Sequence, residues 1–423
     1  MNSYDDTLNF TLRNEDNFYD TVDAESFYDE DAETIYEHLN NKMKLIPFGD
    51  YLKRYIFKLA GFTGSFNEVE LKEYQGIIIE SFAENATPKA FKETTAKLSA
   101  LSKNWLTQTS VNRNVVFLLG FGLGMSVDDV SDFLVHAQRE RDFNFKNPFE
   151  IICWYCYKHG FKYPKFVQLI DAYNEIPCNI EYVSSDATIG LRDVFMKIDT
   201  EDELMQTLAK IKTENDGHFF SVTSKMNFDA LYEKTRNIIA EKYNEDAQDS
   251  AEKEASDYLK KMENSVLLSF EEKNIRAENI RNSAKKYSVE DISEADVEKF
   301  LCCGVPFDGK GNLLKFSKST LANHFNNKRM SRQHIHDIIT RKTDVDRFDL
   351  ITLNFFIHAM DEKICNNKKR FIDFVNDTNE ILTECFMGEM YITNPYECFL
   401  QMCMLSDWPM GAYSDVLERS FES

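Results

Sequence analysis

Glycine and proline are scarce in this chain. The 423 residues include only 15 Gly and 8 Pro, against ordinary usages of about 7% and 5%. β-Sandwiches and β-barrels need many turns that depend on these two residues, so the composition argues against them. Apolar residues recur instead at helical spacing, as at Leu52, Tyr55 and Leu59. The sequence therefore predicts an all-α fold, and its hydrophobic fraction of 43% is ample for a packed core.

Two segments of the chain resemble each other. Each begins with an Arg and continues with apolar residues at the same spacing: Arg113, Val116, Leu119 and Phe121 in the first, and Arg347, Leu350, Leu353 and Phe355 in the second. Further on, residues 147–150 read N-P-F-E and residues 394–397 read N-P-Y-E. Several motifs in the same order predict an internal duplication, with an insertion of about thirteen residues near Asp361–Arg370 in the second copy.

The repeated unit predicts three helices. The first begins near the Arg and buries its Val, Leu and Phe side chains. A second helix follows, and in the first copy Ser126 and Asp129 form a capping box at its start. The third begins at the Asn-Pro pair, with Asn as the N-cap and Pro in the first turn. Three such helices can bury one another, so each copy is expected to be a helical module.

The length of the chain predicts two or three domains. Residues 1–40 form an acidic, aromatic-rich arm that we expect to be partly disordered. Residues 41–180 contain the first repeat and residues 291–423 contain the second. Between them, residues 181–290 form a helical middle segment that includes a strongly charged helix or linker.

Charge is distributed unevenly. The formal net charge is −22, and twelve acidic residues against one Arg place half of it in residues 1–40. Residues 310–347, by contrast, hold nine Lys and Arg against three Asp. The overall charge argues against nucleic-acid binding by the whole surface, but this basic segment leaves one local site open.

The basic segment and the second repeat resemble a degenerate helix-turn-helix module of the Xre/Cro-repressor type. In that family a recognition helix leads through a short polar link into a helix with an R-x2-L-x2-L pattern. Ser331–Thr340, Arg341–Asp346 and Arg347–Phe356 match these parts. The Asn-Pro segment and the helix after it are similar to the helical extension of some bacterial members. The resemblance covers residues 300–410 and, more faintly, 86–160.

This resemblance implies DNA binding through residues 310–347. A reading helix needs basic side chains for phosphates and polar side chains for base edges, a role that Arg332, Gln333 and His336 suit. The candidate nucleic-acid-binding residues are Lys315, Lys318, Lys328, Arg329, Arg332, Gln333, His336, Arg341 and Lys342. The same basic face could instead bind an acidic partner protein or the acidic arm of this chain.

An enzymatic alternative rests on Arg329 and His334. Their R-x4-H spacing resembles the catalytic motif of HEPN-type ribonucleases. In that family the His acts as general acid and base and the Arg stabilises charge on the phosphate, without a metal ion.

Other motifs favour structural roles. Cys153 and Cys156 form a C-x2-C motif, but no second ligand pair has zinc spacing, so we expect buried thiols and no metal. Gly120, Gly122 and Gly124 lack the strand-turn-helix context of a phosphate loop and are expected to permit close helix packing. We expect no cofactor.

Cysteine usage and hydropathy bear on the compartment. Nine scattered cysteines favour reduced thiols, and the acidic N-terminus does not resemble a secretory signal. The longest apolar run, Val115–Met125, is too short to span a membrane. We therefore expect a cytoplasmic, non-enzymatic regulatory or adaptor protein that binds a protein partner through helical surfaces and DNA through residues 310–347.

Overall fold

A computed structural model describes residues 16–23, 27, 31–43, 46–138, 142–145, 147–177, 191–214, 222–263, 268–315, 329–361, 366–385 and 387–422. Within these ranges the regular secondary structure is helical, apart from one isolated antiparallel bridge between Phe307 and Leu313. The prediction of an all-α fold is therefore confirmed. The internal duplication stays a prediction.

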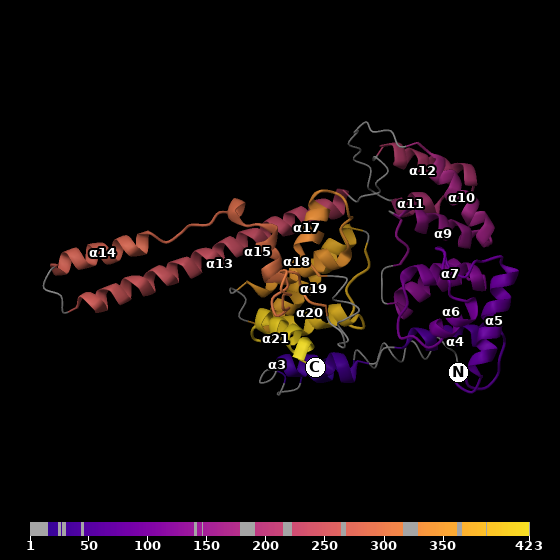
Figure 1. Cartoon of the computed structure of the whole chain (residues 1–423), viewed down its shortest axis with the longest axis horizontal. Coiled ribbons are helices and arrows are strands. Elements are labelled where there is room, and N and C mark those ends of the chain that lie inside the picture. Colours follow the sequence, from indigo (N-terminus) through magenta and orange to yellow (C-terminus); the bar gives the residue numbers. More distant parts are fainter. Residues whose placement is uncertain are drawn as a thin grey trace. The chain divides into compact units, whose positions relative to one another are not determined.

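The chain divides into two compact units (Figure 1). Unit 1 is built mainly from Lys44–Val222, and unit 2 combines Asn17–Met43 with Thr223–Ser423. Unit 2 therefore takes one of its parts from the N-terminal region, which is separated from the rest of the unit by the whole of unit 1 in the sequence.

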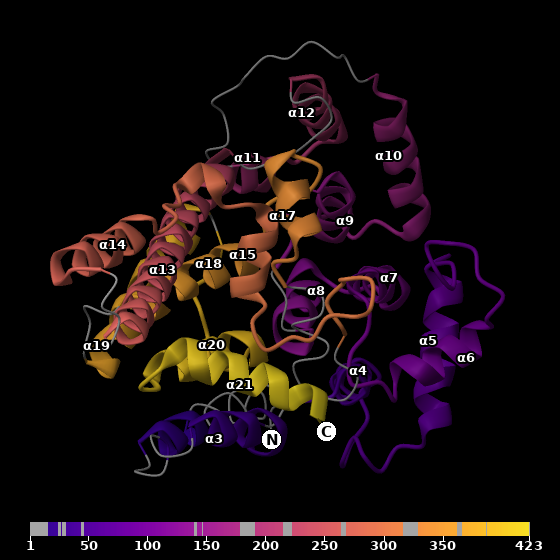
Figure 2. The same cartoon turned by 60° about the vertical axis from the view of Figure 1, so that its left-hand side comes forward.

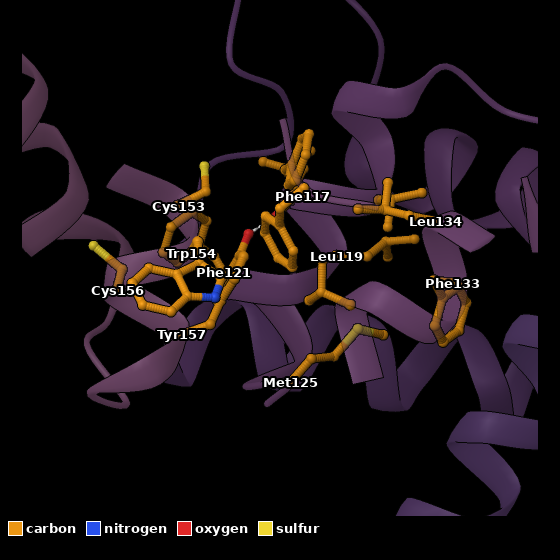
Figure 3. Close-up of a cluster of buried hydrophobic side chains, with 14 of the residues drawn as sticks. Phe117, Leu119, Phe121, Met125, Phe133, Leu134, Cys153, Trp154, Cys156 and Tyr157 are labelled. Atoms are coloured by element: carbon orange, nitrogen blue, oxygen red, sulfur yellow. Dashed lines mark hydrogen bonds between the residues drawn. The ribbon is translucent and has the colours of Figure 1, made fainter. Parts of the chain in front are cut away.

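Unit 1 packs its helices around one aromatic-rich core. The helices are α4 (Phe48–Leu59), α5 (Leu71–Glu84), α6 (Leu98–Trp105), α7 (Arg113–Leu123), α8 (Val127–Asp132), the π-helix η2 (Phe133–Ala137), α9 (Pro148–Lys158), α10 (Tyr163–Glu175), α11 (Leu191–Met196) and α12 (Glu201–Glu214). Figure 3 shows Phe117, Phe121 and Tyr157 close together in this core. The Tyr157 hydroxyl donates to the Phe117 carbonyl at 2.6 Å, so a buried polar group is satisfied where α9 crosses α7.

Helix α7 lies at the centre of unit 1 because its sequence is apolar on every side. Residues Val116–Leu123 are all buried. A Cβ built on Gly122 would lie 1.9 Å from the Phe82 ring, and one on Gly120 would lie 2.9 Å from Tyr157. These two glycines thus allow neighbouring rings to lie directly on the α7 backbone, in the packing role expected of them.

Unit 2 contains the second repeat. Its helices are α3 (Asp31–Glu37), the π-helix η1 (His38–Lys42), α13 (Val222–Met262), α14 (Phe270–Asn282), the 3-10 turn η3 (Val289–Asp291), α15 (Glu294–Leu301), α17 (Arg332–Ile339), α18 (Arg347–Ala359), α19 (Asn367–Glu384), α20 (Pro395–Leu405) and α21 (Pro409–Glu422). α18 packs against α19, α20 and α21, and α15 packs against α17. All eleven residues of α20 are buried, so it is the central helix of this unit.

Predicted helix starts in both repeats are confirmed. α7 begins at Arg113 and α18 begins at Arg347. The side chains of Asn147 and Asn394 cap α9 and α20, each of which opens with a Pro. The capping box that opens α8 is present as well.

Helix α13 changes character along its length. Its first half buries Phe228, Leu231 and Ile239, whereas beyond residue 240 the buried residues are Ala251 and Ala255. That second half runs beside α14, as Figures 1 and 2 show, and Arg281 binds both carboxylate oxygens of Glu252. The charged part of the middle segment is therefore one arm of a helical hairpin, and the buried residues on this arm are alanines.

The described part of the acidic arm lies on unit 2. α3 packs against α20 and α21 (Figure 2), and the aromatic residues Phe18 and Phe27 are fully buried. Glu33 forms an ion pair with Arg419, and Asp23 lies 3.8 Å from Lys368. In the part of the chain that is described, these ion pairs are made with α21 and α19, and they do not involve the basic segment.

Candidate nucleic-acid interface

Helix α17 is the centre of the basic segment. The Ser331 side chain caps its first turn, and Ile335 and Ile338 are buried beneath it. The Arg332 N–H donates to Glu298 of α15 at 2.9 Å. These contacts hold one face of α17 against the rest of unit 2. The opposite face carries Arg332 and Gln333 and is exposed to solvent.

A short hairpin-like loop, closed by residues 307 and 313, precedes α17 in the sequence. The Phe307–Leu313 bridge closes it, and the Asp308 carboxylate accepts from the N–H groups of Lys310 and Asn312 at 2.8 and 2.9 Å. These bonds hold the pKa of Asp308 below its ordinary value. Arg329 Nη1 donates to the Leu314 carbonyl at 2.8 Å, so the loop is tied to the chain that leads into α17.

Five basic side chains of this region are exposed: Lys310, Lys315, Arg332, Arg341 and Lys342. Among the residues described, none of the five forms an ion pair. Exposed cations without ion pairs contribute a local positive potential that can attract an anionic ligand. Two further candidates, Lys318 and Lys328, lie outside the described residues.

Arg347, which the sequence counts among the basic residues of 310–347, does not belong to this surface. Its side chain is 7% exposed and lies 2.9 Å from Glu397, whose side chain is fully buried. The guanidinium also donates to the carbonyls of Gly388 and Glu389 at 3.0 and 3.2 Å. Arg347 therefore joins the start of α18 to the start of α20.

Three polar side chains of α17 have partners of their own. Gln333 Nε2 donates to Asp337 at 2.9 Å, and His336 Nδ1 lies 3.2 Å from Glu294. His334 Nε2 lies 2.8 Å from Asp349, which is 2% exposed. Burial alone would lower the pKa of His334, but the hydrogen bond and charge of Asp349 raise it above its ordinary value.

The alternative catalytic pair is not joined by a hydrogen bond. The guanidinium of Arg329 is directed to the Leu314 carbonyl, whereas His334 is directed to Asp349. A carboxylate behind a His is an arrangement that orients a general base. Asp349 also closes the capping box of α18, however, and that role accounts for its position without any catalysis.

The remaining motifs have structural surroundings. Cys153 and Cys156 are buried in unit 1, and burial raises the pKa of Cys156 to about 12. Outside these motifs, His358 of α18 lies 3.1 Å from Asp377 of α19. Within the described ranges, no group of three or more His, Cys, Asp or Glu side chains could hold a metal ion.

Sequence reasoning missed the partners of the basic segment. Glu294, Glu298 and Asp349 hold α17 from two neighbouring helices. No local pattern marks these residues, because they come together through the packing of α15 and α18 on α17. Lys310 is also absent from the candidate nucleic-acid-binding residues, although its positive charge in the sequence was enough to include it.

Comparison with protein-family models, with curated proteins and with solved structures gives no match to this chain. In the described part, no helix combines the length and apolar character that a membrane span requires.

Proposed function

We propose that this protein is a non-enzymatic regulatory adaptor whose unit 2 binds duplex DNA through the basic surface around α17. The observation that supports it most is the set of five exposed cations without ion pairs: Lys310, Lys315, Arg332, Arg341 and Lys342. Surface charges that form ion pairs are already compensated by their partners. Like charges without ion pairs repel one another, and an anionic ligand would relieve this repulsion.

The layout of the surface also suits a duplex. α17 is supported from below by Ile335 and Ile338, and it presents Arg332 and Gln333 outward. A short helix of this kind can enter the major groove while basic residues at its end and in a neighbouring loop contact phosphates. Arg341, Lys342 and Lys310 would serve as the phosphate contacts.

The test is a salt titration of duplex binding, followed by fluorescence anisotropy on the full chain. Replacing Lys310, Arg341 and Lys342 together with Gln removes the positive charges of the three proposed phosphate contacts. Each lost phosphate contact lowers the slope of log affinity against log salt by about 0.9, so the slope should fall by about 2.7. At 0.1 M salt the affinity should fall by two to three orders of magnitude.

A matched control removes the same charge elsewhere. Lys92, Lys97 and Lys103 are exposed residues on α6 or just before it in unit 1, and replacing these three with Gln should leave the slope unchanged. If the control variant weakens binding as much as the α17 variant does, the effect is one of net charge and the proposal is wrong. A wild-type chain that binds an acidic protein but no duplex contradicts it as well.

A second candidate function, metal-independent RNA cleavage, is favoured by one observation, the pairing of His334 with the buried Asp349. His334 would act as general acid and base and Arg329 would stabilise the phosphate. Cleavage of single-stranded RNA by the full chain that is lost in His334→Ala and in Arg329→Ala would support this function. Absence of cleavage by the wild type, or equal cleavage by the variants, would reject it.

A further inference from the structure

Five helices of the described chain end in the same hydrogen-bonded turn. In each, a residue with positive φ follows the helix, and the next N–H returns to a carbonyl of the last turn, as from Lys342 to Asp337 at 2.8 Å and from Thr87 to Phe82 at 2.9 Å. The residues with positive φ in these turns are Gly61, Ala86, Gly124, Gly160 and Arg341. Glycine is the usual residue here because a Cβ makes the left-handed conformation unfavourable.

Arg341, like Ala86, is therefore an exception that costs stability. Its φ is +56°, close to the +50° of Ala86 and the +63° of Gly124. Its side chain is exposed, and in the described structure it takes part in no hydrogen bond or ion pair. Within the described chain, the backbone hydrogen bonds of the turn offset part of the cost of this conformation, and no contact of the Arg341 side chain adds to them.

The turn also fixes where the Arg341 side chain begins. The N–H of Arg341 donates to Ile338 at 3.1 Å, and the Thr343 N–H donates to Asp337 at 3.1 Å. The Thr340 hydroxyl donates to the His336 carbonyl at 2.7 Å. A cation attached to such a rigid turn loses less entropy when it binds than one on a mobile loop.

We propose that Arg341 is the principal phosphate contact of the α17 surface, and that Arg stands at this left-handed position because its guanidinium binds the nucleic-acid backbone. This inference rests on the function proposed above. A guanidinium can bind two phosphate oxygens at once. Because phosphates are the same in every sequence, Arg341 would contribute affinity without sequence preference.

The test compares Arg341→Gly, Arg341→Lys and Ala86→Gly in the full chain, with thermal unfolding and with binding to two duplexes of different sequence. Arg341→Gly should raise the melting temperature of unit 2 by about 2–4 °C, because strain is relieved. It should also lower the salt slope by about 0.9, which is about eightfold in affinity at 0.1 M salt, equally for both duplexes.

The other two variants separate strain from charge. Arg341→Lys keeps both the charge and the strained backbone, so melting temperature and salt slope should stay near the wild-type values. Ala86→Gly relieves the same strain in unit 1, so it should raise the melting temperature of that unit and leave binding unchanged.

Each contrary result has its own meaning. If Arg341→Gly binds like the wild type while Arg332→Gln with Lys342→Gln weakens binding, the role of Arg341 is overturned and the proposed function stands. If Arg341→Gly lowers the melting temperature, the argument from strain is overturned. If the wild-type chain binds neither duplex, the proposed function and this inference both fail.

Discussion

The stretch from α6 into α7 and the stretch from α17 into α18 share a layout but not a surface. α6 and α17 each span eight residues, and the helix that follows each begins on an Arg after a polar N-cap, Asn112 or Asp346. The link at 106–112 carries no charged residue, whereas the link at 340–346 carries Arg341 and Lys342 followed by Asp344 and Asp346. The two stretches share the length of the first helix and the helix starts on which the fold depends. They differ in the basic residues of the link, which belong to the candidate binding surface.

The shared part includes an ion pair. Arg113 binds Glu150 through Nε and Nη2 at 3.0 and 2.7 Å, as Arg347 binds Glu397 at 2.9 Å. In both units the Glu is the third residue of the helix opened by Asn-Pro, and its Oε2 accepts from a loop N–H, that of Asn144 or Tyr391. We call this arrangement the Arg–Glu clamp. Two clamps of the same construction are what the predicted duplication would leave behind.

Breaking the two clamps should give the largest effects. Arg347→Met leaves the fully buried Glu397 without its ion-pair partner, which should cost about 3–5 kcal/mol of the stability of unit 2. In unit 1 the Arg113 side chain is 15% exposed, so solvent compensates partly and Arg113→Met should cost about 2 kcal/mol. Scanning calorimetry of the full chain, with one transition followed for each unit, measures both.

Replacing both members of one clamp provides the control. Arg347→Met combined with Glu397→Gln removes the uncompensated charge and should recover part of the loss. Losses below 1 kcal/mol in both single variants would contradict a structural role for the clamps.

Lowering the pH should give the next largest difference in stability between the units, because the acidic arm contributes the buried His38 to unit 2. Burial, and to a smaller extent Lys42, lowers the pKa of His38 to about 4. The unfolded chain takes up this proton near pH 6.5 and the folded chain only near pH 4, so stability is lost as the pH falls between these values, by at most about 3 kcal/mol.

The variant His38→Gln isolates this contribution. Thermal unfolding measured from pH 7 to pH 4 should show a smaller acid loss for unit 2 in this variant than in the wild type. The same acid loss in both proteins would show that His38 is not the group responsible.

The helix caps should give a smaller difference. Asn394 accepts from two N–H groups, at 3.0 and 3.2 Å, and is 1% exposed. Asn147 accepts from one, that of Phe149, at 3.0 Å. Each replacement with Ala should cost about 1 kcal/mol, with the larger loss at Asn394, and urea unfolding can compare them. Replacement with Asp, which also caps, should be nearly neutral, and an equal loss with Asp would argue against the capping explanation.

The sequence predicted the helices better than their partners. Local signals such as Asn147, Pro148 and the capping box at Ser126 were enough to place helix starts, because capping depends on neighbouring residues. The repeat pointed to the Arg and the Glu of each clamp but not to their pairing. That pairing depends on loops that bring two helix starts together, and no local pattern encodes it.

The candidate site was predictable to a similar degree. Clustered Lys and Arg residues indicated the surface, and five of the cations are exposed. Arg347 was misassigned because charge in the sequence does not reveal burial. The positive φ of Arg341 was hidden as well, since Arg is seldom left-handed and nothing in its sequence marks the turn.

We expect unit 2 to bind nucleic acid and unit 1, despite its similar layout, not to bind it. Photo-cross-linking of a bromouracil-substituted duplex to the full chain, followed by peptide mapping, tests it most directly. Cross-linked peptides are expected from residues 305–342 and none from residues 97–113. Cross-links at residues 97–113 or on the α13–α14 hairpin, with none at 305–342, would contradict this expectation.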